Sequence, residues 1–284
     1  MIEMRAGRLR CELHPGLGGA IAGLWWGDEP VLRSMPAAQL SSAGSAAAWP
    51  LVPFSNRIGQ ASVVWQGTQQ PLVRPSGDAP HAIRGVGWHR PWALLDADAT
   101  SAMLAYEHRP DPAWPFAFDC SHTLRLSPSG LELTLALTNQ STEPAPASLG
   151  WQPCFVKRPG GQLRFKAGGH WQLGPGHLPV VREAVRGLEA ATEALALDDC
   201  YDDWDGTVLL CDERMQVRLA STLTRLVVHA DPAQPHLCLQ PVSHVANAVH
   251  LYAAGASAFE LGLSILPPGE TLVAQMSLTV ESER

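Results

Sequence analysis

The alternation of apolar and polar residues is the feature that most constrains how this chain folds. Residues 131–138 read Leu-Glu-Leu-Thr-Leu-Ala-Leu-Thr. Such alternation is typical of a β-strand with one face in the core and the other in water. The preceding Ser-Pro-Ser-Gly at 127–130 is a turn signal. Residues 122–126 have the pattern of its hairpin partner, so the sequence predicts an antiparallel pair here.

Similar short patterns recur along the chain and predict a fold built mostly of strands. We expect further strands at 7–13, 61–65, 72–74, 102–108, 208–211, 216–219, 225–229, 237–239 and 271–280. Only residues 182–196 suggest a helix, and Gly187 interrupts it. Many short strands separated by turns favour an all-β sandwich. Because no segment has the composition of a linker, we expect one domain over residues 1–284.

Composition narrows the classes of function. Hydrophobic residues make up 46% of the chain and the formal net charge is −7. These values are typical of a globular protein and argue against binding to nucleic acid through phosphate contacts. No apolar run reaches the roughly 20 residues that a membrane span requires, and the first residues lack the apolar core of a signal peptide. We therefore expect a cytoplasmic protein with no nucleic-acid and no membrane partner.

The cysteines and glycines show no pattern of a metal or nucleotide site. The six cysteines have neither Cys-x-x-Cys nor zinc-ligand spacing, and the simplest interpretation is free, mostly buried thiols in a reducing compartment. The glycine cluster at 16–19 lacks the dinucleotide fingerprint and predicts a hairpin turn. No phosphate-binding loop and no His-Glu-x-x-His motif occurs. We expect no metal and no cofactor.

Two segments near the start of the chain carry polar residues in a specific order. Residues 53–58 read Pro-Phe-Ser-Asn-Arg-Ile, and His81 and Arg90-Pro-Trp92 follow. A guanidinium such as that of Arg57 donates several hydrogen bonds in a fixed fork, which suits vicinal hydroxyls. The ordered set resembles the block P-[YF]-x-N-R-I … H-G-x-x-x-x-x-W of the aldose 1-epimerase (galactose mutarotase-like) family. The resemblance implies that Asn56, Arg57 and His81 contact a sugar, although residues 82–84 separate His81 from the expected Gly.

Two later segments resemble the parts of this family that carry proton transfer. Residues 150–155 resemble G-x-H-P-Y-F, with Gln152 at the position of the His, and residues 237–247 resemble x-C-x-E-P, with Gln240 at the position of the Glu. In the family the His is understood as the general acid and the Glu as the general base. An amide has no accessible pKa, and losing a general acid or base costs about 10²–10⁴ in rate. The substitutions therefore weigh against the family's usual chemistry.

Residues 197–206 are rich in carboxylates that suit a sugar or a cation. The segment resembles D-x-x-[FY] … G of the same family, with Asp198 as the match for the carboxylate that holds sugar hydroxyls and Asp199 as the reserve. The alternative is a calcium loop, but the spacing does not fit the EF-hand template. Among the histidines in motif context, His81 is the candidate for a shifted acid–base role. For His89 and His244 a structural role is the simpler interpretation.

The resemblance extends to Pro-Pro-Gly-Glu at 267–270, which is similar to the family's closing L-x-P-G-E, and so covers nearly the whole chain. It implies a single large antiparallel β-sandwich, the galactose mutarotase-like supersandwich. One implied function is an aldose 1-epimerase-type isomerase that interconverts α and β anomers without a cofactor. The other is a non-catalytic carbohydrate-binding or sensing protein. A sugar derivative such as a phosphate would find candidate contacts at Arg74, Arg84 and Arg90.

Overall fold

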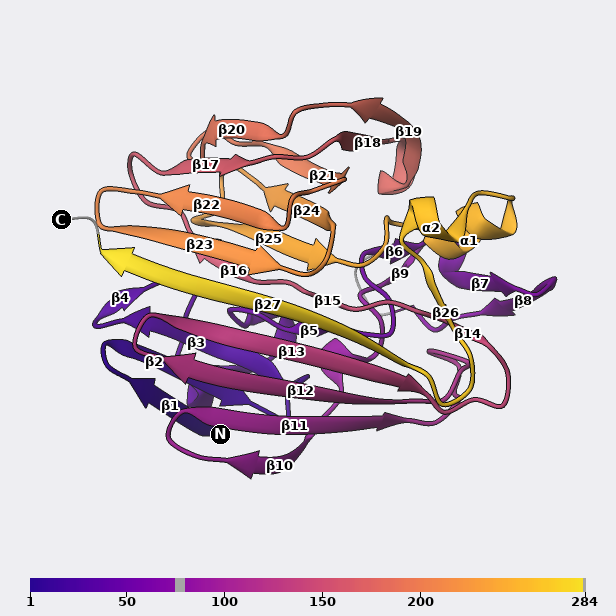
Figure 1. Ribbon diagram of the computed structural model, residues 1–284, viewed down its shortest axis with the longest axis horizontal. Helices are drawn as coiled ribbons and strands as arrows, with labels where there is room; N and C mark the ends of the chain where they lie inside the picture. The colour runs from indigo at the N-terminus through magenta and orange to yellow at the C-terminus, as the bar shows by residue number, and fades with distance from the viewer. Residues whose placement is uncertain (75–79, 283–284) are drawn as a thin grey trace.

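The larger layer of the fold, as far as the structure describes the chain, is a nine-stranded antiparallel sheet. The computed structural model describes residues 1–74 and 80–282. In those residues the sheet order is β10 (Ala93–Ala97), β11 (Ser101–His108), β12 (Phe118–Ser127), β13 (Gly130–Asn139), β27 (Thr271–Ser282), β23 (Met215–Ser221), β22 (Thr207–Cys211), β17 (Gln162–Phe165) and β20 (Leu188–Ala191). The hairpin predicted from residues 122–138 is confirmed, because β12 and β13 pair with Ser127 opposite Gly130. Figure 1 shows β27, in yellow, between β13 and β23.

A second sheet and several smaller ones complete the sandwich. Within the described residues the second sheet runs β19 (Pro179–Ala184), β18 (Gly169–Leu173), β21 (Leu197–Asp202), β24 (Arg225–Ala230), β25 (His236–Val242), β15 (Gly150–Trp151) and β5 (Pro50–Leu51), and β16 (Cys154–Val156) also pairs with β25. A further sheet contains β1 (Ile2–Ala6), β2 (Leu9–His14), β3 (Ala20–Trp26) and β4 (Glu29–Pro30). The expected turn at 16–19 joins β2 to β3.

Short ribbons and helices lie at one end of the sandwich (Figure 1). The ribbons are β6 (Arg57–Ile58) with β9 (Ala82–Ile83), β7 (Ser62–Trp65) with β8 (Thr68–Pro71), and β14 (Ala145–Ala147) with β26 (Ser264–Leu266). In the described part of the chain the α-helices are α1 (Ala248–Ala253) and α2 (Ala258–Leu261). Neither helix is long and apolar enough to cross a membrane.

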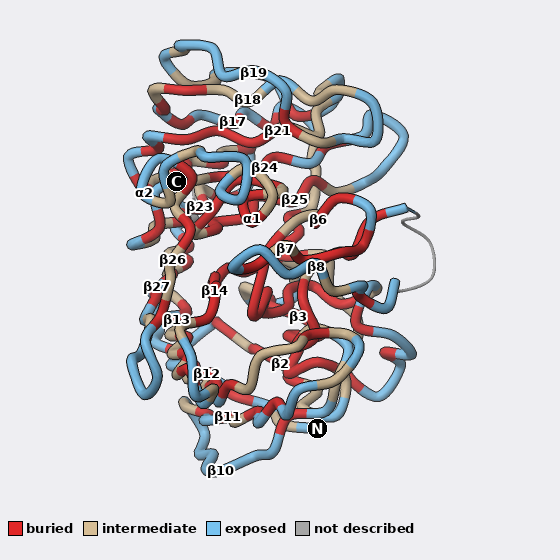
Figure 2. The backbone as a smooth tube through the Cα atoms, turned by 90° about the vertical axis from the view of Figure 1, so that its right-hand side faces the viewer, coloured by how far each residue is buried: buried red, intermediate tan, exposed pale blue. Residues whose placement is uncertain are grey.

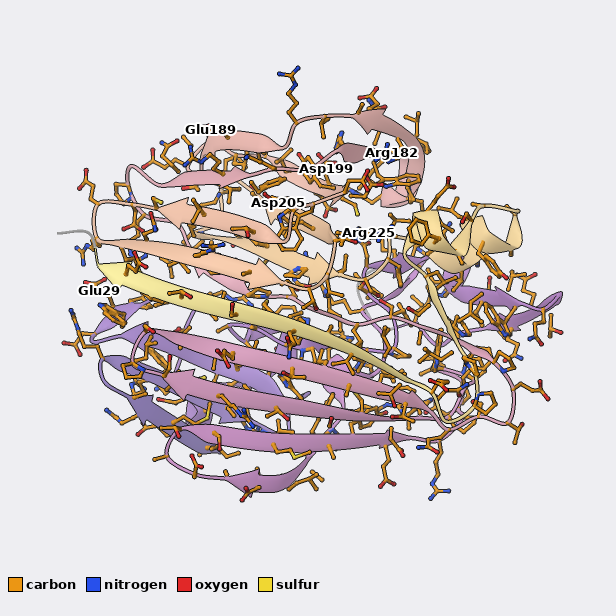
Figure 3. The ribbon with its side chains drawn as sticks, in the orientation of Figure 1. Glu29, Arg182, Glu189, Asp199, Asp205 and Arg225 are labelled. Atoms are coloured by element: carbon orange, nitrogen blue, oxygen red, sulfur yellow. A yellow bond between two sulfur atoms is a disulfide. The ribbon has the colours of Figure 1, made fainter. Side chains whose placement is uncertain are left out.

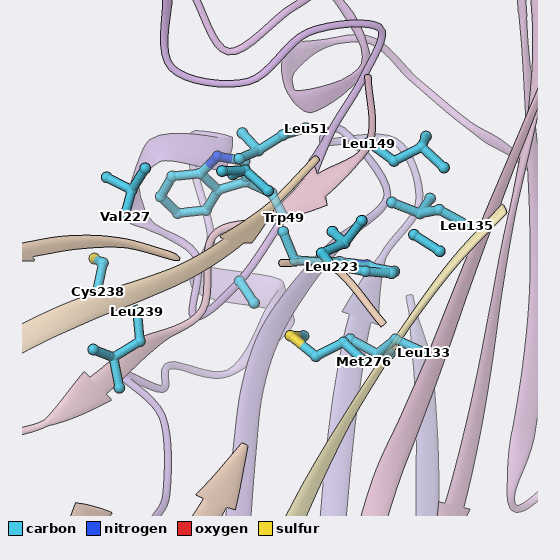
Figure 4. Close-up of a cluster of buried hydrophobic side chains, with 14 of the residues drawn as sticks. Trp49, Leu51, Leu133, Leu135, Leu149, Leu223, Val227, Cys238, Leu239 and Met276 are labelled. Atoms are coloured by element: carbon cyan, nitrogen blue, oxygen red, sulfur yellow. The ribbon is translucent and has the colours of Figure 1, made fainter. Parts of the chain in front are cut away.

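The alternating residues of the strands form the core between the layers. In β13 the side chains of Leu131, Leu133, Leu135 and Leu137 are all buried, and the residues between them are more exposed. Figure 4 shows Leu133 and Leu135 grouped with Trp49 from the other side of the sandwich. Burying one such leucine contributes about 1.5–3 kcal/mol. Figure 2 shows the buried segments running through the interior, while the edge strand β10 is exposed.

Two predictions of local structure are wrong. Residues 182–196 form no helix, because β19 ends at Ala184 and β20 spans Leu188–Ala191. These strands are edges of different sheets, and the chain passes between them at Gly187, whose φ of 102° favours glycine. A Cβ there would lie 2.1 Å from the carbonyl oxygen of Phe165. Residues 72–74 likewise form no strand, because β8 ends at Pro71.

The prediction that all six cysteines are free thiols is also wrong. Cys154 on β16 and Cys238 on β25 face each other in the ladder and form a disulfide. The two residues lie 84 positions apart in the sequence, so a search for short Cys-x-x-Cys spacings does not detect a pair that the sheet register creates. Cys11, Cys120 and Cys200 remain thiols and are buried.

Candidate functional site

A pocket on the second sheet brings together five of the six predicted site residues. Its walls are formed by Asn56, Arg57, Ile83, Arg84, Gln152, Asp198, Val227, His229 and Gln240. These residues come from segments around β6, β9, β15, β21, β24 and β25, which lie far apart in the sequence. The sheet therefore assembles the polar residues of separate motifs on one face.

The pairing of β21 with β24 explains why the side chains of Asp198 and His229 lie close together. Asp198 on β21 lies opposite His229 on β24, and Val227 on β24 lies opposite Gln240 on β25. Directly opposite residues in an antiparallel pair project from the same face of the sheet. Asp199, the reserve candidate, projects from the other face, as alternation requires. It lies 3.3 Å from Nε2 of His170, and Figure 3 marks its position on β21.

Gln152 and Gln240, which the sequence motifs align with an acid and a base, lie opposite each other. Gly150 pairs with Val242 and Cys154 pairs with Cys238, so the same register places Gln152 opposite Gln240. Both glutamine side chains are buried. Their amide groups can donate and accept hydrogen bonds but cannot transfer a proton near neutral pH.

Gln152 is engaged by an arginine that the same pocket contains. Nε of Arg84 donates a hydrogen bond of 3.0 Å to Oε1 of Gln152. The guanidinium also lies 5.7 Å from the ring centroid of Trp49 and 5.5 Å from that of Trp88, within the range of cation–π attraction. Of the three arginines considered for a phosphate, Arg84 is the one on the pocket wall. Arg74 is exposed outside it, and Arg90 is paired with Asp111.

Asn56 and Arg57 enter the pocket from a tight turn. Asn56 has a φ of 53°, a left-handed conformation that asparagine adopts more readily than most residues. The turn directs Arg57 across the pocket, where Nη2 lies 3.3 Å from Oδ2 of Asp198. Nη1 of Arg57 also donates to Oδ1 of Asn56 at 3.4 Å. The sequence motif thus places a guanidinium and an amide beside the carboxylate.

Asp198 is the electrostatic centre of the site. Besides Arg57, its carboxylate lies 3.4 Å from Nδ1 of His229 and 3.2 Å from Nδ1 of His177. Burial alone would raise the pKa of Asp198. The hydrogen bond from His229, with the charges of Arg57, His229 and His177, outweighs burial and holds the pKa below its usual value. Asp198 is therefore ionised at neutral pH.

The other candidate histidines lie away from the pocket wall. His81 is buried, and its Nδ1 accepts a hydrogen bond of 3.2 Å from the backbone N–H of Gln60. A Cβ added to Gly176 would lie 2.8 Å from Nε2 of His81, so His81 packs against the loop that carries His177. His89 is exposed outside the pocket. Burial lowers the pKa of His244 to about 4 and keeps it neutral.

His177 and His229 are the polar residues that the sequence motifs did not single out. His229 is the last residue of the strand expected at 225–229, and His177 lies in a short 3₁₀ turn, Pro175–His177. Only the pairing of β21 with β24 places His229 beside Asp198. Among the described residues, including those of the acidic segment 198–205, no group of three or more Asp, Glu, His or Cys side chains is arranged so that it could hold a metal ion. Asp202, for example, is paired with Arg182.

Solved structures of similar fold are found in several bacteria. A putative aldose 1-epimerase from Escherichia coli K12 superposes with a TM-score of 0.88 at 26% identity, over 99% of this chain and 98% of that one. A galactose mutarotase-like protein from Clostridium acetobutylicum gives a TM-score of 0.85 at 17% identity, over 99% and 95% of the two chains. These likenesses confirm the galactose mutarotase-like sandwich that the sequence motifs imply.

Comparison of sequences gives the same family. The uncharacterized protein YphB of Escherichia coli K12 is 28% identical over 281 residues, which cover 93% of each chain. The family model described as aldose 1-epimerase matches residues 1–279. The match covers every segment that contributes to the pocket. The chain therefore belongs to the aldose 1-epimerase family.

Proposed function

We propose that the pocket binds an aldose and that the protein interconverts its α and β anomers. The observation that carries this proposal is the convergence of Asn56, Arg57, Asp198 and the two glutamines on one pocket in a chain of this family. A carboxylate accepts hydrogen bonds, a guanidinium donates them, and amides do both. Such a set matches a ligand whose surface is covered with hydroxyl groups.

Anomer interconversion needs proton transfer at two oxygens. The anomeric hydroxyl loses its proton, the bond between the anomeric carbon and the ring oxygen breaks, and the ring oxygen gains a proton. After the carbonyl rotates, the steps reverse and the ring closes on the other face. Gln152 and Gln240 can hold these oxygens by hydrogen bonds, but neither side chain can exchange a proton near neutral pH. The catalysis we propose therefore requires a different titratable group.

A second candidate function is a carbohydrate-binding or sensing protein without catalysis. The observation that favours it is the pair of opposed, buried glutamines, one of which is already engaged by Arg84. Under this alternative the same residues hold the sugar and the rate of anomer exchange does not change.

Anomer exchange measured by NMR distinguishes the two functions. Purified protein is mixed with each member of a panel of aldoses and sugar phosphates, and exchange between the anomeric proton signals is compared with the spontaneous rate. Exchange well above that rate supports the mutarotase. Saturation transfer to a sugar without faster exchange supports the binding protein. The absence of both effects across the panel would refute sugar recognition by this pocket.

A further inference from the structure

His229 combines exposure to the pocket with a contact to the carboxylate of Asp198. It lies on β24, lines the pocket, and has a side chain that is 50% exposed. Its Nδ1 faces Oδ1 of Asp198 at 3.4 Å. Within residues 1–74 and 80–282, its Nε2 makes no hydrogen bond to the protein. The imidazole therefore contacts Asp198 through one nitrogen and presents the other to a ligand.

The ionised carboxylate of Asp198 sets the chemical state of that ring. A carboxylate that accepts from Nδ1–H selects the tautomer in which Nε2 carries the lone pair. It also stabilises the imidazolium that forms when Nε2 takes a proton. Asp198 is thus a positioning residue for His229, in addition to any contact with sugar hydroxyls.

His229 lies near Gln240, the residue that the sequence motifs align with the general base. Gln240 lies opposite Val227, which is two residues from His229 on the same face of β24. Diagonal neighbours of this kind have side chains about 7–8 Å apart, within reach of a long or aromatic side chain. A sugar that rests against Gln240 therefore lies within reach of the His229 ring.

We propose that His229 is the proton-transfer residue of this site, an inference that rests on the proposed mutarotase function. Nε2 removes the proton from the anomeric hydroxyl, and the electron pair of that bond forms the carbonyl as the bond to the ring oxygen breaks. The ring oxygen keeps the electron pair of the broken bond and takes the proton from the imidazolium. Both oxygens are bonded to the anomeric carbon in the cyclic sugar, so one imidazole serves both. The step is balanced and needs no co-reactant.

The test replaces His229 by asparagine, whose amide nitrogen takes the place of Nδ1 and retains a donor to Asp198. We expect anomer exchange to fall by about 10²–10⁴-fold, the usual contribution of a general acid or base. Sugar affinity, measured by saturation transfer, should stay close to that of the unchanged protein. His89→Asn is the matched control, because His89 is exposed and outside the pocket, and it should leave the exchange rate unchanged.

The pH profile supplies a readout that a structural role would not change. The rate of anomer exchange by the unchanged protein should fall in acid, because a protonated imidazole cannot accept a proton, and His229→Asn should remove that fall. The groups that face His229 or act on its charge are Asp198 on β21, the disulfide-bonded Cys238 and His236 on β25, and, through Asp198, Arg57 and His177.

The outcomes separate this inference from the function on which it rests. If the unchanged protein exchanges anomers and His229→Asn does so equally fast, the inference is overturned and the mutarotase function stands. If the unchanged protein binds sugar without accelerating exchange, both are overturned. Loss of rate together with loss of sugar binding in His229→Asn would make His229 a binding residue and would also overturn the inference.

Discussion

Replacing Asp198 by asparagine tests the electrostatic account of the site. The change keeps the size of the side chain and removes the charge that faces Arg57, His177 and His229. The side chain of Asp198 is 24% exposed and that of Arg57 is 14% exposed, so the cluster is neither at the surface nor fully buried. Surface ion pairs contribute about 0–1 kcal/mol, whereas removing one partner of a buried pair costs about 3–5 kcal/mol. We therefore expect Asp198→Asn to lower the free energy of unfolding by about 2 kcal/mol at neutral pH.

The effect should depend on pH with a defined sign. The pKa of Asp198 is lowered in the folded protein, whereas an unfolded aspartate titrates near 3.9. The stabilisation by its charge is thus fully present above the unfolded pKa and is lost as pH falls through the lower, folded pKa. The difference in unfolding free energy between the unchanged protein and Asp198→Asn should therefore shrink in acid.

The assay is urea unfolding followed by tryptophan fluorescence, repeated from about pH 7 to about pH 3. Asp28→Asn serves as the matched control, because Asp28 is exposed in the turn between β3 and β4, and it should change stability by less than about 0.5 kcal/mol. A destabilisation of Asp198→Asn that stays the same at every pH would refute the reasoning, because the lost energy would then not come from the carboxylate charge. A more stable variant would refute it as well.

Three other changes give expected outcomes. Arg57→Ala should abolish saturation transfer from the protein to sugar, because it removes the guanidinium beside Asp198; retained binding would show that the site lies elsewhere. Gln152→His with Gln240→Glu should raise anomer exchange, by about 10²–10⁴-fold if the added pair acts as acid and base; no gain would mean that the pocket geometry has also diverged. Burial lowers the pKa of His122 to about 3. Below about pH 6.5 this histidine therefore takes up a proton in the unfolded chain and stays neutral in the folded one. The free energy of unfolding should then fall by up to about 1.4 kcal/mol per pH unit. His122→Gln should flatten that decline between about pH 6.5 and about pH 4 in urea unfolding, and an unchanged slope would contradict the assignment.

The sequence predicted the strands whose two faces differ in environment. β13 has one face in the core and one outside, so its alternation was visible in the residues. β19 and β20 lie at sheet edges. β19 is exposed after its first residue, and β20 has no buried residue, so neither strand has a buried apolar face that would distinguish residues 182–196 from a helix. α1 contains six residues, which is too short for a 3.6-residue period to be recognised.

The site residues that lie in sequence motifs were predictable, and those that only strand pairing brings into the site were not. Asn56, Arg57, Gln152, Asp198 and Gln240 each lie in a segment that resembles the family, and all five line the pocket. The histidines beside Asp198 belong to no such segment. Their proximity follows from the register of β21 with β24 and from the loop that ends at His177, and neither can be read from local patterns.

The position of β27 has a consequence for the order in which the protein can be made. Of the nine strands in the larger sheet, β27 is the last to leave the ribosome, yet it lies in the interior of the sheet between β13 and β23. Until it emerges, β13 and β23 each present an edge of unsatisfied backbone groups, and such edges promote aggregation. We expect nascent chains that end before Thr271 to be captured by chaperones, and the sheet to close only after translation has passed Ser282.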